Sequence, residues 1–547
     1  MNRLADLIFS DLTLTKDEIL NKYQKREIAE GAKITRIAPS PTGFMHLGNL
    51  YGAIIDERLA HQSNGIFYLR IEDTDKKREV ANGVETIIKA FAKFGLSFDE
   101  GATLGEDNGN YGPYRQRQRE DIYKVFAKEL LEKGLAYPCF CTEEELAEMR
   151  ENQQANKENF GYYGKYAKYS TLSEDEAIAK IEAGESYVLR LRSSGSIENK
   201  VKFEDLVKGK MDVTQNDQHV VILKADGIPT YHFAHVVDDY LMGTTHVVRG
   251  EEWLATLPIH IELFDVLGFK RPKYMHTAHL MKVDEETGNK RKLSKRKDPE
   301  LALDFYHEQG FPIVSVKEYL MTLLNSNFED WRRANADAPM EDFEFTTKKM
   351  PSSGALFDMT KLRDVSKTVI SKMTADEVYD AVATWAENYD QKFYEVFTRD
   401  ADFSKAILAI GRGGKKPRKD IAIWSETQGY MGFMFDELFA PDYTLAENLQ
   451  ADAKAVLEEY INVYDDADEQ NVWFDKIKEV APKFGYAADT KAYKANPDDF
   501  KGHSGDISMI IRVAVTGSQN SPDMYSVLKI LGKDAVVNRI KIAIDKM

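Results

Sequence analysis

The sequence predicts an α/β fold with a parallel sheet, followed by a long helical region. An apolar run at Ile34–Ala38 is ended by prolines, a helix begins near His46, and a second apolar run follows at Gly65–Ile71. A strand, a glycine-containing turn, a helix and a strand in this order form a βαβ unit of a parallel sheet. Beyond about Pro312, helical periodicity dominates.

Length and composition indicate a globular protein of several domains. The 547 residues allow about three to five domains. With 43% hydrophobic and 30% charged residues, collagen-like and wholly disordered chains are excluded. The 73 basic and 90 acidic residues give a net charge of −17, which argues against a protein coated in nucleic acid. Two basic stretches, Lys290–Lys297 and Arg412–Lys419, are each interpreted alone as solvated loops.

Cysteine usage and hydropathy predict a cytoplasmic protein. Only Cys139 and Cys141 occur, and this pair cannot form a disulfide framework, so a reducing compartment is expected. Asp6 interrupts any signal core within Met1–Ser10, and no apolar run of ~20 residues appears. Secretion and a membrane span are therefore not expected.

Periodicity predicts the remaining elements. Residues 1–32 are expected to form an added amphipathic helical segment without chemistry, because apolar residues recur there at helical spacing: Leu4, Leu7, Ile8 and Leu12. A helix at Lys124–Lys133 precedes Ala136–Ala225, which has the mixed pattern of an insertion between two halves of the sheet domain. Strands are predicted to return at Tyr231–Val237 and Thr245–Val248.

The segment RIAPSPTGFMHLGN, residues 36–49, places an imidazole at the start of a helix. Helix starts favour anions because free backbone N–H groups and the positive end of the dipole point at the ligand. His46 is positioned to donate to a phosphate, and Gly48 allows a nucleotide to approach the backbone. Alone, this pattern also fits a structural histidine.

A second basic motif, KLSKR at 292–296, sets Lys292 and Lys295 on either side of a serine. Two ammonium groups over a triphosphate stabilise the charge that develops in phosphoryl chemistry. Together with His46 on the same sheet domain, this pattern favours a nucleotide site over a solvated loop.

These two segments resemble the HIGH and KMSKS signatures of the class I aminoacyl-tRNA synthetases. Three longer segments are more specific and resemble the glutamyl-tRNA synthetases: RIAPSPTG at 36–43, RIEDTD at 70–75 and THVVRGEEWL at 245–254. The resemblance runs from about Thr35 to Lys546, and the first thirty-odd residues fall outside it.

The resemblance implies a doubly wound, Rossmann-type α/β catalytic domain with an insertion, and an all-helical carboxyl-terminal domain. Glutaminyl enzymes with a similar catalytic half carry β-barrels there instead. Residues 1–32 are expected to be a helical N-terminal extension. The parts implied by the resemblance are two catalytic halves (33–128 and 227–268), an inserted acceptor-binding α+β domain (129–226), a KMSKS-loop and stem-contact region (269–372) and a helical anticodon-binding domain (373–547).

The implied reaction is attack of a glutamate carboxylate on the α-phosphate of ATP, then transfer of the glutamyl group to the terminal ribose of tRNA(Glu). Mg²⁺ accompanies ATP, the partners are L-glutamate, ATP and tRNA, and the enzyme is expected to be a monomer without a membrane. His46, Lys292 and Lys295 are the candidate catalytic residues. The residues implied for ATP are His46, Gly48, Asn49, Glu252, Met281, Lys292, Leu293, Ser294, Lys295 and Arg296.

A glutamate pocket needs one acid and at least one guanidinium. The resemblance implies that Arg36 and Arg249 bind the carboxylates of the glutamate substrate, with Arg249 the better candidate for the side-chain carboxylate. Glu72 is implied to bind the substrate ammonium. Other implied pocket residues are Ala38, Ser40, Tyr231 and His235. His235 stands where relatives commonly have Asn, and Asn49 also departs from the signature.

Many relatives hold zinc with cysteines spaced like Cys139 and Cys141 and two ligands about 25 residues later. Here the later positions are Tyr166 and Lys168, which are not usual zinc ligands, so no zinc is expected. Near the carboxyl end, the resemblance implies that Arg512 contacts an anticodon base, with Ser521 and Met524 beside it. An Arg can pair with a base edge or stack on it; the alternative is that Arg512 caps or pairs on a helix.

Three rival functions stay open. One is a non-discriminating enzyme that also charges tRNA(Gln). A second is the shorter ligase that glutamylates a modified tRNA base, but that family lacks the long helical region. The third is a non-catalytic tRNA-binding paralogue, which is expected to lose His46, Lys295 or Glu72, and all three are present.

Overall fold

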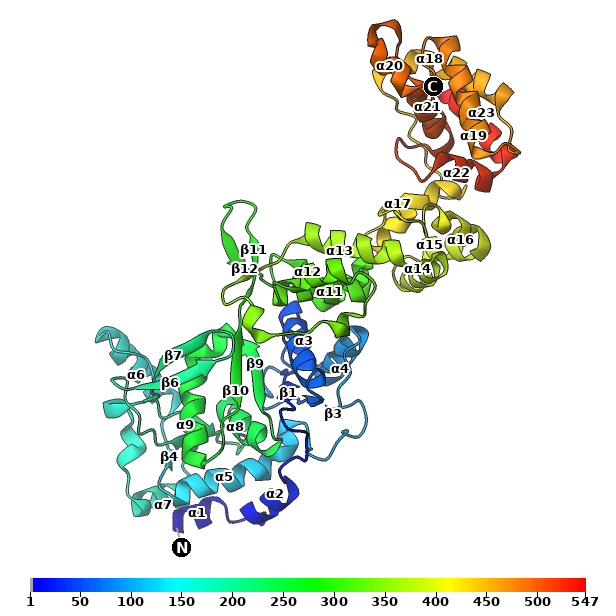
Figure 1. Cartoon of the computed structure of the whole chain (residues 1–547). Helices are drawn as coiled ribbons and strands as arrows, with labels where there is room; N and C mark the ends of the chain where they lie inside the picture. The colour runs from blue at the N-terminus through cyan, green and yellow to red at the C-terminus, as the bar shows by residue number, and fades with distance from the viewer. Residues whose placement is uncertain (1–2) are drawn as a thin grey trace. The chain divides into compact units, whose positions relative to one another are not determined.

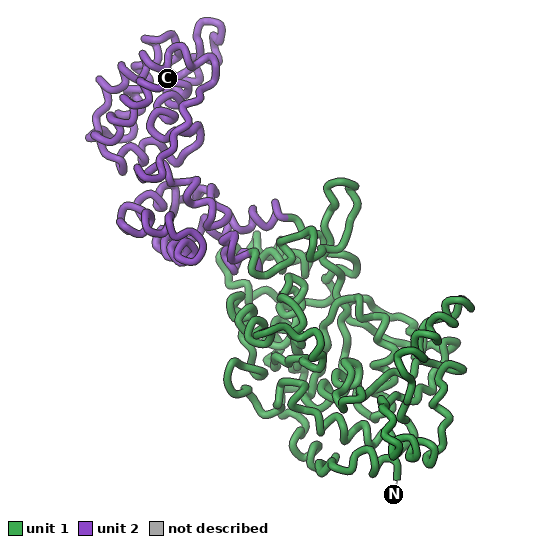
Figure 2. The backbone as a smooth tube through the Cα atoms, turned by 180° about the vertical axis from the view of Figure 1, so that it is seen from behind, with its two compact units in different colours: residues 1–305, 317–358 green, residues 306–316, 359–547 purple. Residues whose placement is uncertain are grey.

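The computed structural model describes residues 3–547 and has two compact units. Unit 1 contains residues 1–305 and 317–358, and unit 2 contains residues 306–316 and 359–547 (Figure 2). Between residues 3 and 547, no helix is long and apolar enough to cross a membrane.

In unit 1 (Figure 1), a three-stranded and a two-stranded parallel sheet lie side by side, with β1 (Ile34–Ile37) next to β9 (His246–Gly250). The order is β3 (Glu100–Gly101), β2 (Ile66–Leu69), β1, β9 and β10 (Lys273–Thr277). The backbone N–H of Thr245 donates to the carbonyl of Ile34 at 3.0 Å, which joins β9 to β1. The strand order therefore reverses between β1 and β9, and ligands of doubly wound folds bind at such a switch point.

Helices cover this sheet. They are α3 (Leu47–His61), α4 (Gly83–Lys93), α5 (Glu120–Glu132), α8 (Tyr231–Leu241) and α9 (Leu257–Leu267). The strand predicted at Tyr231–Val237 is wrong, because these residues form the first turns of α8. Phe233 to Asp239 are all buried, and the polar residues among them, His235, Asp238 and Asp239, pair inside the protein, so this stretch of the helix has no solvent-exposed polar face.

The insertion carries a small antiparallel sheet and a separate hairpin. The sheet consists of β4 (Ala136–Cys139), β5 (Val188–Leu191) and β8 (Val221–Leu223). The hairpin consists of β6 (Lys200–Asp205) and β7 (Gly209–Thr214), and the helices are α6 (Glu143–Ala155) and α7 (Glu174–Glu182). At the end of β6, buried Asp205 accepts from the backbone N–H groups of Val207 and Lys208, which fixes the turn.

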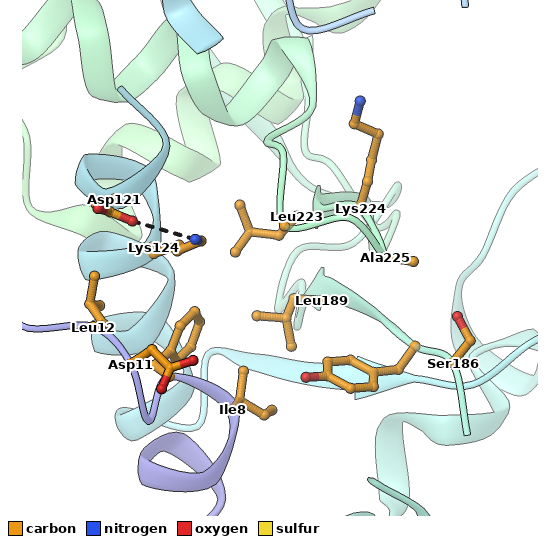
Figure 3. A pocket seen from close by; sticks show the side chains of 13 residues that line it. Ile8, Asp11, Leu12, Asp121, Lys124, Ser186, Leu189, Leu223, Lys224 and Ala225 are labelled. Atoms are coloured by element: carbon orange, nitrogen blue, oxygen red, sulfur yellow. Dashed lines mark hydrogen bonds and ion pairs between the residues drawn. The ribbon is translucent and has the colours of Figure 1, made fainter. Parts of the chain in front are cut away.

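The N-terminal segment forms two short helices, α1 (Arg3–Ile8) and α2 (Lys16–Lys22), and belongs to the core of unit 1. Leu4 and Ile19 are buried in the same cluster as α5, α8 and α9. A cavity of about 310 Å³ lies between this segment and the insertion, where Ile8, Lys124 and Leu189 are among the lining residues (Figure 3). No predicted site residue lines this cavity.

After β10, the chain forms a three-stranded sheet of β11 (Leu280–Val283), β12 (Lys290–Lys292) and β13 (Ala355–Leu356). The helices before α13 are α10 (Leu303–Gln309), α11 (Ile313–Leu324) and α12 (Phe328–Ala334). The KLSKR segment begins at Lys292, the last residue of β12, so the basic motif directly follows the β11–β12 hairpin.

From residue 359, the described chain of unit 2 is built from helices around two apolar clusters. The first group is α13 (Met359–Lys372), α14 (Ala375–Tyr389), α15 (Gln391–Thr398), α16 (Ala401–Ala409) and α17 (Thr427–Met431). The second is α18 (Glu447–Val463), α19 (Gln470–Val480), α20 (Thr490–Ala495), α21 (Ser504–Thr516), α22 (Met524–Leu531) and α23 (Lys533–Lys546). The predicted helical region is therefore confirmed.

Candidate active site

The charged residues predicted for glutamate lie at the carboxyl ends of three strands of the central sheet. Arg36 is in β1, Glu72 follows β2, and Arg249 is the penultimate residue of β9. Arg36, Glu72 and Arg249 are 4%, 9% and 9% exposed, respectively. The topology thus gathers an acid and two guanidiniums around the switch point, although the outermost two, Arg36 and Arg249, are 213 positions apart in the sequence.

Arg36 is held by a charged cluster that the sequence did not reveal. Its Nε donates to Asp239 Oδ1 at 3.1 Å, and Arg70 donates to the same oxygen at 2.7 Å. Burial alone raises the pKa of Asp239, but these guanidiniums reverse the effect and lower it. The positive charge of Arg36 is therefore paired with a carboxylate of the protein itself, that of Asp239 on α8.

Glu72 provides the acid of the pocket. Its Oε1 accepts from Arg70 at 3.1 Å. Burial raises the pKa of Glu72, and Arg70 and Arg36 oppose this effect. Burial also raises the pKa of Tyr231, where Glu72 adds to the increase and Arg249 counteracts it. Tyr231 is therefore close enough to both groups to interact with their charges.

Arg249 differs from the other buried guanidiniums in this region. Its Nη2 is buried and has no hydrogen-bond partner. No carboxylate of the described chain lies within 4.0 Å of it, whereas Arg36, Arg70 and Arg119 each pair with an aspartate. A buried, unmatched positive charge is costly unless an anion joins it. This position suits a ligand carboxylate.

Three other predicted pocket residues lie nearby but have different surroundings. His235 is fully buried, with Nε2 at 2.9 Å from the Tyr274 hydroxyl and Nδ1 at 3.1 Å from Asp239. Both ring nitrogens are thus used inside the protein. Ala38, after β1, is half-buried, and Ser40 is exposed.

On the nucleotide side, His46 is the N-cap residue of α3. Asn49 accepts from the His46 backbone N–H at 3.0 Å, so this departure from the signature caps the helix. A Cβ at Gly48 would lie 3.1 Å from the imidazole, so glycine leaves room for the ring. The ring Nδ1 is buried without a partner. Burial, followed by Lys295, lowers the pKa of His46 to about 4, so the ring is neutral at pH 7.

The KLSKR loop lies beside the same turn. Lys295 Nζ is 4.4 Å from the centre of the Phe44 ring and would be 3.5 Å from a Cβ at Gly43. Within residues 3–547, no ion pair engages Lys292, Lys295 or Arg296. These charges therefore remain available for phosphates.

An acid that sequence reasoning missed supports this loop. Buried Asp298 accepts from both terminal nitrogens of Arg291 and from the Ser294 backbone N–H. Leu293 is buried beneath the loop. The loop therefore has a fixed base, while Lys295 is exposed.

Two more residues predicted for ATP follow β9 and β10. Glu252 Oε2 lies 3.0 Å from His279 Nε2. Met281 pairs with Lys292 across the β11–β12 hairpin, and a Cβ at Gly354 would lie 2.3 Å from its Cγ. The hairpin therefore joins Met281 directly to the start of the basic loop.

The cysteine pair has its own partner. The Sγ atoms of Cys139 and Cys141 are each 3.4 Å from the Tyr162 hydroxyl. Tyr166 and Lys168 bond to Glu158 and Glu145 instead. The four positions compared with a zinc site thus do not form one ligand set, and the absence of zinc stays a prediction.

In unit 2, the three residues predicted for the anticodon lie together. Arg512 Nη1 donates to the Ser521 carbonyl at 3.3 Å and hydroxyl at 3.2 Å, and Ser521 Oγ is 3.3 Å from Met524 Sδ. Ser521 and Met524 are buried and Arg512 is half-buried. Ser521 and Met524 therefore support Arg512 from within the fold, and Arg512 is the side chain of the three that reaches the surface.

The second basic stretch, Arg412–Lys419, is partly structural. Arg412 donates to the carbonyls of Leu408 and Ile370, at the ends of α16 and α13. Arg418 pairs with Asp420. These contacts favour the interpretation of this stretch as part of the folded surface.

Comparisons with known proteins decide the family. Residues 33–364 match the catalytic domain of the class I tRNA synthetases (E and Q), and residues 418–544 match an anticodon binding domain. A glutamate–tRNA ligase of Acetivibrio thermocellus is 50% identical, covering 98% of this chain and 99% of the relative. The chain belongs to the glutamate–tRNA ligase family.

Other members of the glutamate–tRNA ligase family are also similar. A relative from Sorangium cellulosum is 42% identical over 98% of this chain and 99% of its own length. A solved glutamate-tRNA synthetase from Elizabethkingia anophelis has a TM-score of 0.75 and 26% identity, covering 94% of this chain and all of that one. The class I fold and the helical anticodon-binding region are thereby confirmed. The family model begins at residue 33, in agreement with the resemblance, whereas the relatives from Acetivibrio thermocellus and Sorangium cellulosum match 98% of the chain and so share most of the N-terminal segment.

Proposed function

We propose that this chain joins L-glutamate to the 3′-terminal ribose of tRNA(Glu) with ATP. The observation that carries this proposal is Arg249, a buried guanidinium without a carboxylate partner at the switch point of the sheet. Glu72 supplies the acid for the substrate ammonium in the same region, and the unpaired basic loop lies beside the start of α3. Family membership supports the same reaction.

In the first step, an α-carboxylate oxygen of glutamate attacks the α-phosphorus of ATP. The bond to the β-phosphate oxygen breaks and pyrophosphate leaves, giving glutamyl-adenylate. Lys292 and Lys295 stabilise the developing phosphate charge, and His46 donates from its neutral ring. Mg²⁺ enters bound to ATP and neutralises phosphate charge. The buried, unpartnered Nδ1 of His46 supports a polar ligand at this place.

In the second step, a hydroxyl of the terminal ribose attacks the carbonyl carbon of the adenylate, and AMP leaves. Arg249 holds the substrate's side-chain carboxylate throughout, and Glu72 holds its ammonium. No protein nucleophile is required, because positioning and preorganised charge lower the barrier.

For tRNA, we propose that residues 129–226 bind the acceptor end, that 269–372 contact the stem, and that 373–547 read the anticodon. A monomeric state and a cytoplasmic location stay predictions.

The direct test is charging of purified tRNA(Glu) and tRNA(Gln) transcripts with labelled glutamate, ATP and Mg²⁺. Charging of tRNA(Glu) alone is the expected result. Charging of both would identify a non-discriminating enzyme that needs a later amidation step. Charging of neither would overturn the proposed function.

Arg512 offers a separate test of the anticodon assignment. Arg512→Ala is expected to raise KM for tRNA(Glu) by about tenfold, because a base contact is typically worth ~1–3 kcal/mol. KM values for glutamate and ATP are expected to stay unchanged in steady-state charging assays. Exposed Arg399, which pairs with Glu437, provides the control variant Arg399→Ala. An effect confined to glutamate would contradict an anticodon role.

A further inference from the structure

The guanidinium of Arg249 is held by two imidazoles. Its Nε donates to His276 Nε2 at 2.9 Å, and its Nη1 donates to His260 Nδ1 at 2.9 Å. Both histidines are fully buried. His276 lies on β10 directly opposite Arg249 in the strand register, and His260 lies on α9. The remaining terminal nitrogen, Nη2, is the one without a partner.

These contacts determine the protonation of both rings. A guanidinium can only donate hydrogen bonds, so His276 Nε2 and His260 Nδ1 must each present a lone pair. Each ring then carries its proton on the other nitrogen. Burial, together with Arg249, lowers the pKa of both imidazoles, which keeps them neutral.

Asp205 fixes the His276 tautomer. Its Oδ2 lies 2.7 Å from His276 Nδ1, and both side chains are fully buried. Burial opposes ionisation of Asp205, but hydrogen bonds from His276 and two backbone N–H groups outweigh it and lower the carboxyl pKa. The ring proton therefore stays on Nδ1, and Nε2 stays an acceptor. Asp205 ends β6, so the inserted hairpin supports a residue of the catalytic sheet.

His232 completes the support on the other side. His260 Nε2, which carries the proton, lies 3.0 Å from His232 Nδ1. His232 belongs to the first turn of α8, the helix that also carries Asp239. Arg249 is thus held from β10 and α9, with further support from β6 and α8, and all these contacts lie within unit 1.

We propose that Asp205, His276 and His260 are positioning and specificity-determining residues that orient Arg249 with neutral acceptors and so leave it without a directly bonded carboxylate, available to the substrate carboxylate. A carboxylate in either place would hold the guanidinium equally well but would neutralise it, as Asp239 does for Arg36. An unmatched charge in a buried pocket favours an anionic side chain over its amide, because an amide leaves the guanidinium uncompensated. The support of Arg249 by two neutral histidines therefore favours binding of glutamate over glutamine.

This inference rests on the proposed function, and two isosteric variants test it. His260→Glu and His260→Gln both place an acceptor near Arg249, but only the first adds a negative charge. KM for L-glutamate in tRNA(Glu) charging is expected to be at least about tenfold higher in His260→Glu than in His260→Gln. KM for ATP is expected to be the same in both. The inhibition constant of L-glutamine relative to KM for glutamate is expected to fall in His260→Glu, which reports the loss of selectivity.

A second pair keeps the test decisive if His260→Glu does not fold, as judged by thermal unfolding. Asp205→Asn removes the charge that fixes the His276 tautomer, and is expected to raise KM for glutamate about tenfold with kcat within about threefold. Asp212→Asn, on exposed Asp212 of the same hairpin, is the matched control. Equal glutamate KM values in the two His260 variants, or in Asp205→Asn and its control, would overturn the inference. Failure of the wild-type enzyme to charge tRNA(Glu) would instead overturn the proposed function.

Discussion

Replacing Arg249 with alanine is expected to lower kcat/KM for glutamate by about three to four orders of magnitude. The side chain is buried, its Nη2 has no partner, and no carboxylate of the described chain pairs with it. A site built to hydrogen-bond a substrate group rejects an analogue without that group by about 10⁴–10⁵, and removing the arginine is expected to lose most of such a factor. The measurement is steady-state charging of tRNA(Glu) at varied glutamate and at varied ATP.

Two further variants make this result specific. Arg249→Lys keeps the charge but loses the planar fork, so it is expected to recover only part of the activity. Arg271→Ala, on exposed Arg271 of unit 1, is expected to behave like the wild type. If Arg249→Ala keeps its glutamate kinetics while its thermal midpoint drops, Arg249 is a structural residue.

Lys295→Ala is expected to lower kcat about 10²–10³-fold with little change in KM for ATP. The lysine lies beside the turn before His46 and forms no ion pair in the described chain. Under the proposed function, its charge acts mainly on phosphate charge that develops in the transition state, and one such donor is typically worth this factor. Single-turnover formation of glutamyl-adenylate and steady-state charging measure the effect.

The same loop provides the control for Lys295. Lys297 is exposed and lies 3.9 Å from Asp284, so Lys297→Ala removes a neighbouring charge without touching the proposed phosphate contact. Its kcat is expected to stay within about twofold of the wild type. A similar loss in both variants would indicate a general effect of loop charge, and unchanged turnover of Lys295→Ala would refute its role.

The sequence was sufficient for the fold class and for most charged residues of the candidate site. The βαβ pattern from Ile34 and the motifs at 46–49 and 292–296 are local, because turns, helix starts and short motifs are set by neighbouring residues. The pattern does not reveal the helix at Tyr231, because its residues from Phe233 to Asp239 are all buried, and burial removes the exposed polar face from which helical periodicity is recognised.

What only the tertiary structure decided is which charge is matched and which is free. Arg36 lies within an apolar run and Arg249 follows one, so the two look alike in the sequence, yet Asp239 pairs with the first and two histidines hold the second. The partners lie up to 203 positions away along the chain. Coulomb interactions and hydrogen bonds depend on distance in space and on burial, and a sequence without the fold specifies neither. The sequence therefore determined the residue types of the pocket, and the fold determined their charge state and orientation.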